Sequence, residues 1–255
     1  MPRTCIPDFS AARNPEQGWT SGPWASADIF GEPVPLNVTR FGLDAGAHVP
    51  GIRLGGTEAM AYVIAGSAAA LAPESAGERF TLAPETVLWL TGCDQMSAHA
   101  GQNGLDLLVA EATGLDPDVP PFPMRKAFAA AELPHLASTR DTRDRLDLVT
   151  ENVPVGARAV RADRIIYHPG DTAAPHYHTD CHHVFCVLTG SGLLYADGEA
   201  HRLTAPDSAL VGPGEVHWFE NDTGENFSFV EFWAPPPTET IWTVTGDRCT
   251  WAPAG

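Results

Sequence analysis

The strongest constraint on how this chain can fold is that its sequence repeats once along its length. Residues of the first half recur in the second half in the same order: Gly46 and Gly66 match Gly170 and Gly190, Arg40 matches Arg164, and residues 82–92 (LAPETVLWLTG) match residues 204–214 (TAPDSALVGPG). The offset is 124 residues for the first two matches and 122 for the third, a difference that a short insertion or deletion between hairpins explains. Self-similarity at a fixed period indicates a repeated structural unit. The 255 residues are therefore expected to form two similar units.

Each unit is expected to consist of short β-strands. The chain contains 24 Gly and 23 Pro, together about 18% of its residues where roughly 12% is usual, and hydrophobic residues still make up 44%. Many turns combined with ample apolar residues favour strands over long helices. The expected strands are 34–43, 59–64, 86–90 and 105–110 in the first unit, and 161–168, 183–188, 208–211 and 227–233 in the second.

The charge and the apolar pattern exclude several classes of protein. The formal net charge is −17, which repels nucleic-acid phosphates and anionic lipid surfaces. The sequence contains no apolar run of the roughly 18 residues that a membrane-spanning helix needs, and residues 1–19 have no apolar core of signal-peptide length. The five cysteines are odd in number and widely spaced, as expected for reduced thiols. We therefore expect a cytoplasmic protein that binds neither nucleic acid nor membranes.

Histidines cluster in the second half at a spacing that is typical of metal ligands. His176 and His178 are separated by one residue, so on a strand both side chains would lie on the same face. His217, from a distant strand, can meet them inside a closed barrel. Neutral imidazole is a preferred ligand of Fe, Mn, Ni, Cu and Zn. The pattern therefore predicts a metal site with open coordination positions.

The full spacing around these histidines resembles the two motifs of the cupin superfamily. It reads G-x5-H-x-H-x4-(acid)-x6-G at residues 170–190, followed by P-G-x2-H-x3-N at residues 213–221. The resemblance covers about 52 residues directly and implies a small antiparallel barrel with a metal in its mouth. The repeat extends this expectation to most of the chain. The chain as a whole is thus similar to a bicupin: an all-β protein of two tandem antiparallel jelly-roll barrels with a short helical and Pro-rich connector.

The repeat and the resemblance together divide the chain into successive parts. These are an N-terminal extension (1–30), an N-terminal barrel without metal (31–114), a connector (115–150), a C-terminal barrel with the metal site (151–236) and a C-terminal tail (237–255). Within the connector, residues 114–123 (GLDPDVPPFP) are expected to be extended. Residues 124–131 (MRKAFAAA) are the best candidate for a helix.

The chain departs from the family motif at one ligand position. The position that the family usually fills with Glu is occupied by His183. Strand alternation favours His183 over its neighbour His182 as the fourth ligand, because the two side chains point to opposite faces. The resemblance therefore implies an all-histidine ligand set of His176, His178, His183 and His217, with His182 as the alternative for the fourth position.

The first unit retains none of these ligands. By the repeat offsets, the four ligand positions and Asn221 fall on Ile52, Leu54, Ala59, Gln95 and His99. The nearby His48 and Glu58 are out of register, and a shifted register would turn their side chains to the wrong face. We expect the first barrel to be structural, as a packing partner, a lid support or the surface of a homodimer.

An all-histidine shell leaves the charge of a divalent ion uncompensated, so an anionic small-molecule substrate could complete the site. Fe(II) is favoured because several cupin dioxygenases are similar in using three histidines, while Mn, Ni, Cu and Zn remain compatible with the ligands. Glu231 is a candidate general base or a hydrogen-bond acceptor for a ligand imidazole. It would be only a solvated charge if its strand turned it outward.

The leading expectation is a metal-dependent enzyme of dioxygenase type that acts on a small organic molecule. Similar bicupins also include redox-neutral isomerases, decarboxylases and hydrolases, which form the alternative. A third hypothesis is a bicupin that binds a small ligand without turning it over.

Overall fold

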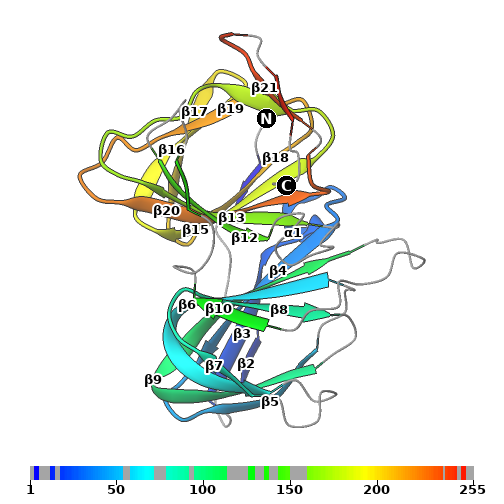
Figure 1. Ribbon diagram of the computed structural model, residues 1–255, viewed down its shortest axis with the longest axis vertical. Coiled ribbons are helices and arrows are strands. Elements are labelled where there is room, and N and C mark those ends of the chain that lie inside the picture. Colours follow the sequence, from blue (N-terminus) through cyan, green and yellow to red (C-terminus); the bar gives the residue numbers. More distant parts are fainter. Residues whose placement is uncertain are drawn as a thin grey trace.

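The computed structural model describes residues 3–5, 12–14, 18–53, 58–71, 79–91, 95–113, 126–129, 135–137, 143–149, 160–237, 239–245 and 248–250. Within these ranges the chain is almost entirely β-strand, and the helix α1 spans only Ala27–Phe30. The strands form two all-β bodies that are stacked along the long axis of the molecule (Figure 1). The all-β fold expected from the sequence is confirmed.

The N-terminal body is built on an antiparallel sheet with the strand order β10-β8-β6-β9-β4-β3-β2. In addition, β5 pairs with β9 and β7 pairs with β6. The strands are β2 (Ala12–Asn14), β3 (Trp19–Ala25), β4 (Leu36–Leu43), β5 (His48–Arg53), β6 (Glu58–Leu71), β7 (Arg79–Leu82), β8 (Thr86–Thr91), β9 (Gln95–Ala112) and β10 (Lys126–Ala129).

The C-terminal body consists of two antiparallel sheets that enclose an aromatic interior. The inner sheet, which faces the other body, has the order β1-β18-β15-β20-β13-β12-β11, and the outer sheet has the order β17-β16-β19-β14-β21-β22. The inner strands are β1 (Arg3–Cys5), β11 (His135–Ala137), β12 (Asp144–Val149), β13 (Arg161–Tyr167), β15 (His182–Thr189), β18 (Ser208–Val211) and β20 (Phe227–Ala234). The outer strands are β14 (His176–His178), β16 (Ser191–Ala196), β17 (Glu199–Thr204), β19 (His217–Glu220), β21 (Glu239–Trp242) and β22 (Arg248–Thr250).

The repeat seen in the sequence is present in the strand order of the two bodies. The order β10-β8-β6-β9-β4-β3-β2 in one corresponds to β1-β18-β15-β20-β13-β12-β11 in the other. The correspondence includes an exchange, because β1 precedes the N-terminal body in the chain but pairs with β18, whereas β10 follows that body and pairs with β8. One edge strand of each body, β10 or β1, therefore comes from outside the part of the sequence that forms the rest of that body.

This exchange corrects the predicted helix at residues 124–131. Lys126–Ala129 is the strand β10, paired with β8 from Lys126 opposite Trp89 to Ala129 opposite Thr86. The Ala-rich segment has good helix propensity, but the free edge of β8 offers main-chain partners that outweigh a weak local preference. The segment 114–123, predicted to be extended, lies outside the described residues.

Strands also occur in parts of the chain that were expected to be an extension, a connector and a tail. The hairpin β2–β3 and the hairpin β11–β12 occupy equivalent places at the end of each sheet. The segment after residue 237 contributes β21, which pairs with β14 in the outer sheet. The barrels are thus more interleaved along the chain than the sequence boundaries imply.

The two bodies pack through a shared hydrophobic core. Side chains of β3, β4, β6 and β9 meet side chains of β15, β18 and β20 in one cluster, which includes Trp24, Met60, Leu108, Val184, Leu210 and Phe232. Trp24 also donates from its indole Nε1 to the Pro206 carbonyl at 2.9 Å. Separate apolar clusters fill the interior of each body. In the described part of the chain, no helix is long and apolar enough to span a membrane.

The repeated glycines Gly66 and Gly190 allow two main-chain segments to approach closely. Each has a positive φ, and a Cβ built on either would lie 2.2 Å from a carbonyl oxygen, that of Gly104 or that of Asn226. Gly198 has a similar φ of 81° but no atom within 4 Å of a built Cβ. A side chain at Gly190 would therefore cause both backbone strain and a steric clash, whereas a side chain at Gly198 would cause backbone strain alone.

We predict that Gly190→Ala lowers the free energy of unfolding by about 2–5 kcal/mol, because both strain and a steric clash arise. Gly198→Ala should cost only about 1–2 kcal/mol, because it introduces the strain alone. Urea unfolding of both variants measures the difference. Equal losses would show that the close approach at Gly190 contributes nothing.

Candidate metal centre

Three histidines converge in the C-terminal barrel from strands β14 and β19. His176 and His178 occupy alternate positions of β14, and His176 pairs directly with His217 of β19. One ligand atom from each of the three lies within 4.8 Å of the other two, and all three side chains are buried. The sequence prediction that these residues meet at one place is confirmed in the geometry.

The hydrogen bonds of the three imidazoles leave one nitrogen of each available to a metal. Nδ1 of His176 lies 2.9 Å from the Ala174 carbonyl oxygen, and Nδ1 of His217 lies 3.0 Å from that of Glu215. A carbonyl oxygen can only accept, so both Nδ1 atoms carry the hydrogen and both Nε2 atoms keep a lone pair. Contacts of this kind orient metal-binding histidines and set their tautomer. The donor set therefore fits a divalent transition metal.

His178 is held in the same way by strand β21. Its Nδ1 lies 3.2 Å from Thr240 Oγ1 and 3.4 Å from the Glu239 carbonyl oxygen. Its Nε2 accepts a hydrogen bond of 3.2 Å from the indole Nε1 of Trp233. The two contacts together assign the hydrogen of His178 to Nδ1 and the lone pair to Nε2.

Burial keeps these imidazoles in the neutral form that metal ligands require. Desolvation lowers the pKa of His176 and His178 well below 6.5, and it also lowers the pKa of His217. Neighbouring imidazoles and the positive charge of Arg143 act in the same direction on His176 and His178. The centre is thus neutral and ready to bind a cation at physiological pH.

His183 lies beside the three-histidine group and connects it to Glu231. Its Nδ1 is 3.0 Å from His217 Nε2, and its Nε2 is 3.1 Å from Glu231 Oε2. It does not belong to the group whose ligand atoms all lie within 4.8 Å of one another. Its role as a fourth ligand stays a prediction. His182 is half-buried on the opposite face of β15.

Glu231 points into the barrel, so the outward alternative considered for it is wrong. The side chain is 1% exposed, and desolvation raises its pKa. Without a metal, Nε2 of His217 accepts a hydrogen bond from Nδ1 of His183. In either tautomer of His183, its contact with Glu231 requires one hydrogen between Nε2 and the carboxyl oxygen, because two lone pairs do not attract each other. The contact between His183 and Glu231 therefore holds a proton inside the barrel.

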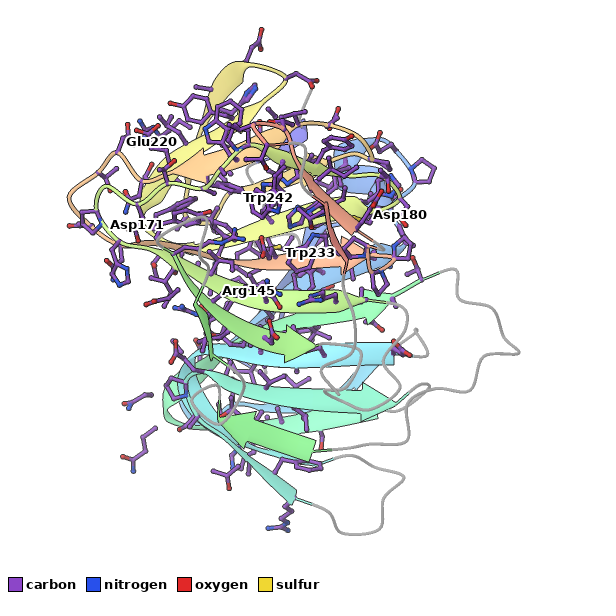
Figure 2. The ribbon with its side chains drawn as sticks, turned by 45° about the horizontal axis from the view of Figure 1, so that its top comes forward. Arg145, Asp171, Asp180, Glu220, Trp233 and Trp242 are labelled. Carbon is purple, nitrogen blue, oxygen red and sulfur yellow. The ribbon has the colours of Figure 1, made fainter. Side chains whose placement is uncertain are left out.

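Two tryptophans that the sequence did not single out complete the surroundings of the histidines. Trp233 stacks on His183 with ring centroids 4.5 Å apart, and Trp242 lies over His176 at 4.9 Å. Figure 2 shows both tryptophans among the side chains gathered in the C-terminal barrel. Aromatic residues inside a β-barrel are usually core, so the sequence carried no signal to distinguish them. Thr240 was missed because it lies in the predicted tail, where the sequence analysis expected no strand.

A buried cluster of opposite charges adjoins Glu231 on the inner sheet. Arg145 contacts Asp163 at 2.5 Å and Asp147 at 3.1 Å, and Arg161 lies 3.7 Å from Asp147. Burial, reinforced by the neighbouring carboxylate of Asp163, raises the pKa of Asp147 to about 7. Charges removed from water are tolerated only when they are paired. The cluster places fixed cations and anions next to the histidine site.

In the N-terminal barrel, no comparable group of metal-binding side chains is found among the described residues. His48 and His99 pair across β5 and β9 with ring centroids 6.1 Å apart, and His99 is exposed. The side chains of Ile52 and Gln95, and the whole of Leu54, lie outside what the structure describes.

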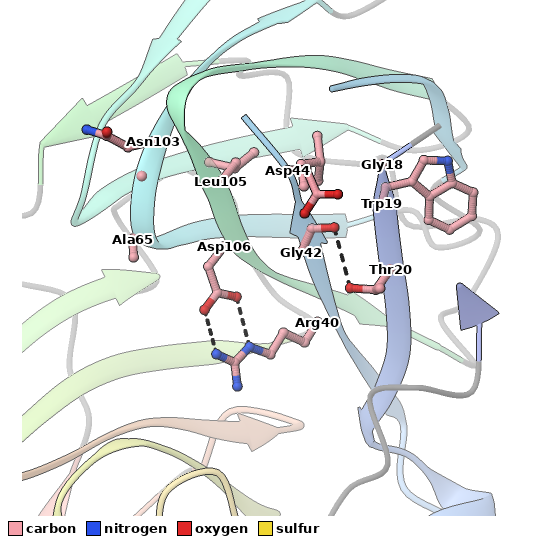
Figure 3. Close-up of a pocket in the computed structure, with 12 residues that line it drawn as sticks. Gly18, Trp19, Thr20, Arg40, Gly42, Asp44, Ala65, Asn103, Leu105 and Asp106 are labelled. Atoms are coloured by element: carbon pink, nitrogen blue, oxygen red, sulfur yellow. Dashed lines mark hydrogen bonds and ion pairs between the residues drawn. The ribbon is translucent and has the colours of Figure 1, made fainter. Parts of the chain in front are cut away.

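The N-terminal body instead has a groove of about 480 Å³ at the end of β3, β4 and β9 (Figure 3). Arg40 crosses it to form two hydrogen bonds with the carboxylate of Asp106, of 2.8 and 2.5 Å. The central charges of the groove therefore neutralise each other, and it offers no set of metal ligands.

Comparison with known proteins supports the fold. Residues 163–233 match the family model described as "Cupin domain". An uncharacterized protein of Aquifex aeolicus (strain VF5) is 43% identical over 47 residues, which are 18% of this chain and 39% of that protein. The match thus spans well under half of the relative.

Among solved structures, oxalate decarboxylase of Bacillus subtilis is similar over 92% of this chain. One such structure has a TM-score of 0.72 and 15% identity and is covered to 77%. A second, of an oxalate decarboxylase described for its substrate binding mode, has a TM-score of 0.73, 15% identity and 78% coverage. At this level of identity the likeness concerns the fold, and the two-barrel architecture is confirmed.

We predict that His176→Ala, His178→Ala and His217→Ala each weaken the binding of a divalent metal by more than about 100-fold, because each removes a ligand. His182→Ala, on the other face of β15, should bind as wild type does. Isothermal titration of chelator-treated protein with Mn(II) or Co(II), with circular dichroism to check folding, measures this. Full affinity in a folded His178→Ala variant would contradict the site.

The lowered pKa values also predict how stability depends on pH without metal. Between 6.5 and the lower pKa of the folded state, unfolded chains bind a proton at His178 that the folded protein does not. This contribution to stability is complete above 6.5 and is lost as the pH falls below it. The difference in unfolding free energy between wild type and His178→Gln should therefore shrink by about 1.4 kcal/mol per pH unit below that value. A constant difference from pH 7 to 5.5 would contradict a neutral buried imidazole.

Proposed function

We propose, from the premise that this chain is a bicupin with a three-histidine centre in its C-terminal barrel, that it is a metal-dependent enzyme of dioxygenase type acting on a small organic anion. The observation that carries the proposal is the arrangement of His176, His178 and His217. They are buried and neutral, and each carries its lone pair on Nε2. A metal there would replace the contacts that Trp233 and His183 now make with two of these atoms. Three protein ligands leave positions open for a substrate.

The charge distribution favours an anionic substrate. The three-histidine group contains no carboxylate, so a divalent ion bound there keeps its charge. The positive charge of Arg143 is close enough to lower the pKa of His176, His178, His183 and Glu231. Arg143 also donates a hydrogen bond of 3.2 Å to the Tyr167 hydroxyl. A carboxylate, enolate or phenolate would therefore be drawn to the site.

The residues around the centre orient the histidines, exclude water from the site and hold a proton. When bound, Fe(II) would supply Lewis acidity and a partner for O₂. His183 and Glu231 hold a proton at their 3.1 Å contact, where it can be given to or taken from a substrate. Phe185 lies against His183, and Trp233 and Trp242 cover the histidines, so water is kept from the site.

A second candidate is decarboxylation of a small organic acid. It is favoured by one observation, the shared two-barrel fold with proteins named oxalate decarboxylase. The two reactions differ in the gas they exchange, because a dioxygenase incorporates O₂ whereas a decarboxylase releases CO₂.

The test begins with elemental analysis of the purified protein. Oxygen uptake and CO₂ release are then measured across a panel of catechols, β-diketones, hydroxy acids and dicarboxylic acids. The dioxygenase proposal expects bound iron and substrate-dependent oxygen uptake. Bound Mn with CO₂ release and no net oxygen uptake would favour the second candidate. A protein that retains no divalent metal would contradict both.

The same assay tests the proton held by Glu231. Glu231→Gln keeps a hydrogen-bonding side chain beside His183 but cannot transfer a proton, so kcat should fall by about 100-fold or more while metal content is unchanged. Glu220→Gln is a matched control, because Glu220 accepts from the Tyr195 hydroxyl away from the histidines. Wild-type kcat in a metal-loaded Glu231→Gln enzyme would remove Glu231 from the mechanism.

A further inference from the structure

We propose that Trp233 selects the ligand at the metal centre by donating a hydrogen bond from its indole N–H to an anionic oxygen bound beside His178. The inference rests on the proposed metal centre and names a specificity-determining residue for it. Three observations support it, namely where Trp233 lies, what its N–H contacts and what holds the ring, and they are followed by the consequence of a metal on His178.

Trp233 lies in the middle of the inner sheet and faces the barrel interior. It pairs with Arg161 of β13 on one side and with His183 of β15 on the other. Its side chain is 3% exposed. The indole is therefore fixed between two neighbouring strands, and it forms part of the wall of the histidine site.

The indole N–H is directed at a ligand nitrogen. Nε1 of Trp233 lies 3.2 Å from Nε2 of His178, and the two rings are nearly perpendicular, with an interplanar angle of 89°. Nδ1 of His178 is already engaged by Thr240 and Glu239. Nε2 is thus the atom that His178 presents to a metal, and the indole donor is aimed at that same atom.

The ring is held in this orientation by charged and aromatic neighbours. The guanidinium of Arg161 lies 5.6 Å from the centre of the indole, and His183 stacks on the indole with an interplanar angle of 21°. Arg161 in turn contacts Asp147 and Asp163 in the buried charge cluster. These neighbours limit how far the indole N–H can move away from His178, so the donor stays beside the metal site.

A metal bound to Nε2 of His178 would take the lone pair that the indole now contacts. The N–H would have to turn aside from that lone pair, and it would then lie within reach of whatever else binds the ion on that side. An oxygen of a carboxylate, enolate or phenolate has further lone pairs and can accept it. A metal-bound neutral imidazole has none to offer, because its one lone pair is on the metal and its other nitrogen carries hydrogen. Trp233 therefore favours anionic oxygen ligands over neutral nitrogen ligands.

The test uses the full-length protein loaded with Co(II), whose visible spectrum changes when a ligand binds. Acetate serves as the anionic oxygen probe and imidazole as the neutral nitrogen probe. Wild type is compared with Trp233→Phe and with a variant in which Trp233 is replaced by benzothienylalanine, whose sulfur takes the place of the N–H group with little change of shape. Trp218→Phe is the matched control, because Trp218 stacks on Tyr195 rather than on a histidine.

We expect both Trp233 variants to weaken acetate binding by about 10-fold or more, the net contribution of a hydrogen bond to a charged group. Their affinity for imidazole should stay within about 2-fold of wild type, and their affinity for Co(II) should not fall. Trp218→Phe should bind both probes as wild type does.

Other outcomes have distinct meanings. Wild-type acetate affinity in both metal-loaded Trp233 variants would overturn the inference and leave the metal centre intact. Weaker acetate binding in Trp233→Phe alone, with the benzothienylalanine variant unaffected, would also overturn it, because shape rather than the N–H would be responsible. A wild-type protein that binds no Co(II) would instead overturn the proposed function.

Discussion

The architecture and the site both depend on the alternation of side chains along strands that are buried on both faces. In β20, Val230 and Phe232 point into the core shared with the N-terminal body, whereas Phe229, Glu231 and Trp233 point into the C-terminal barrel. Every residue of this strand is buried. The same strand therefore joins the two bodies and lines the histidine site, so a one-residue slip would exchange the two faces.

This double burial gives the N-terminal body a definite role even though its described part holds no comparable histidine group. Its sheet covers the back of the strands that present His183, Glu231 and Trp233. In addition, β1, which precedes the N-terminal body in the chain, pairs with β18 of the C-terminal body, and β10 of the connector pairs with β8 of the N-terminal body. The N-terminal body thus packs against the back of the sheet that lines the histidine site and holds it in place.

The interior of the C-terminal barrel combines neutral imidazoles with paired charges that are largely removed from water. Arg145, Asp147 and Asp163 offset one another, while desolvation raises the pKa of Glu231 beside His183. Burial lowers the pKa of a base and raises that of an acid. The same buried environment therefore keeps the imidazoles neutral and raises the pKa of Glu231. The indole of Trp233 connects these two parts, because it touches Arg161 on one side and His178 and His183 on the other.

The sequence by itself determined the repeat, the all-β class, eight of the strands and the shared face of His176 and His178. These follow from local signals: glycine spacing, strand periodicity and the separation of His176 from His178 by one residue. Only the tertiary structure decided which residues surround them. The strand at Lys126–Ala129 depends on a free edge of β8, and the contacts of Thr240 and Trp242 depend on β21 lying next to β14. The roles of Glu231 and Trp233 likewise depend on partners about 50 residues away along the chain, His183 and His178, because hydrogen bonds between distant strands leave no pattern in either strand alone.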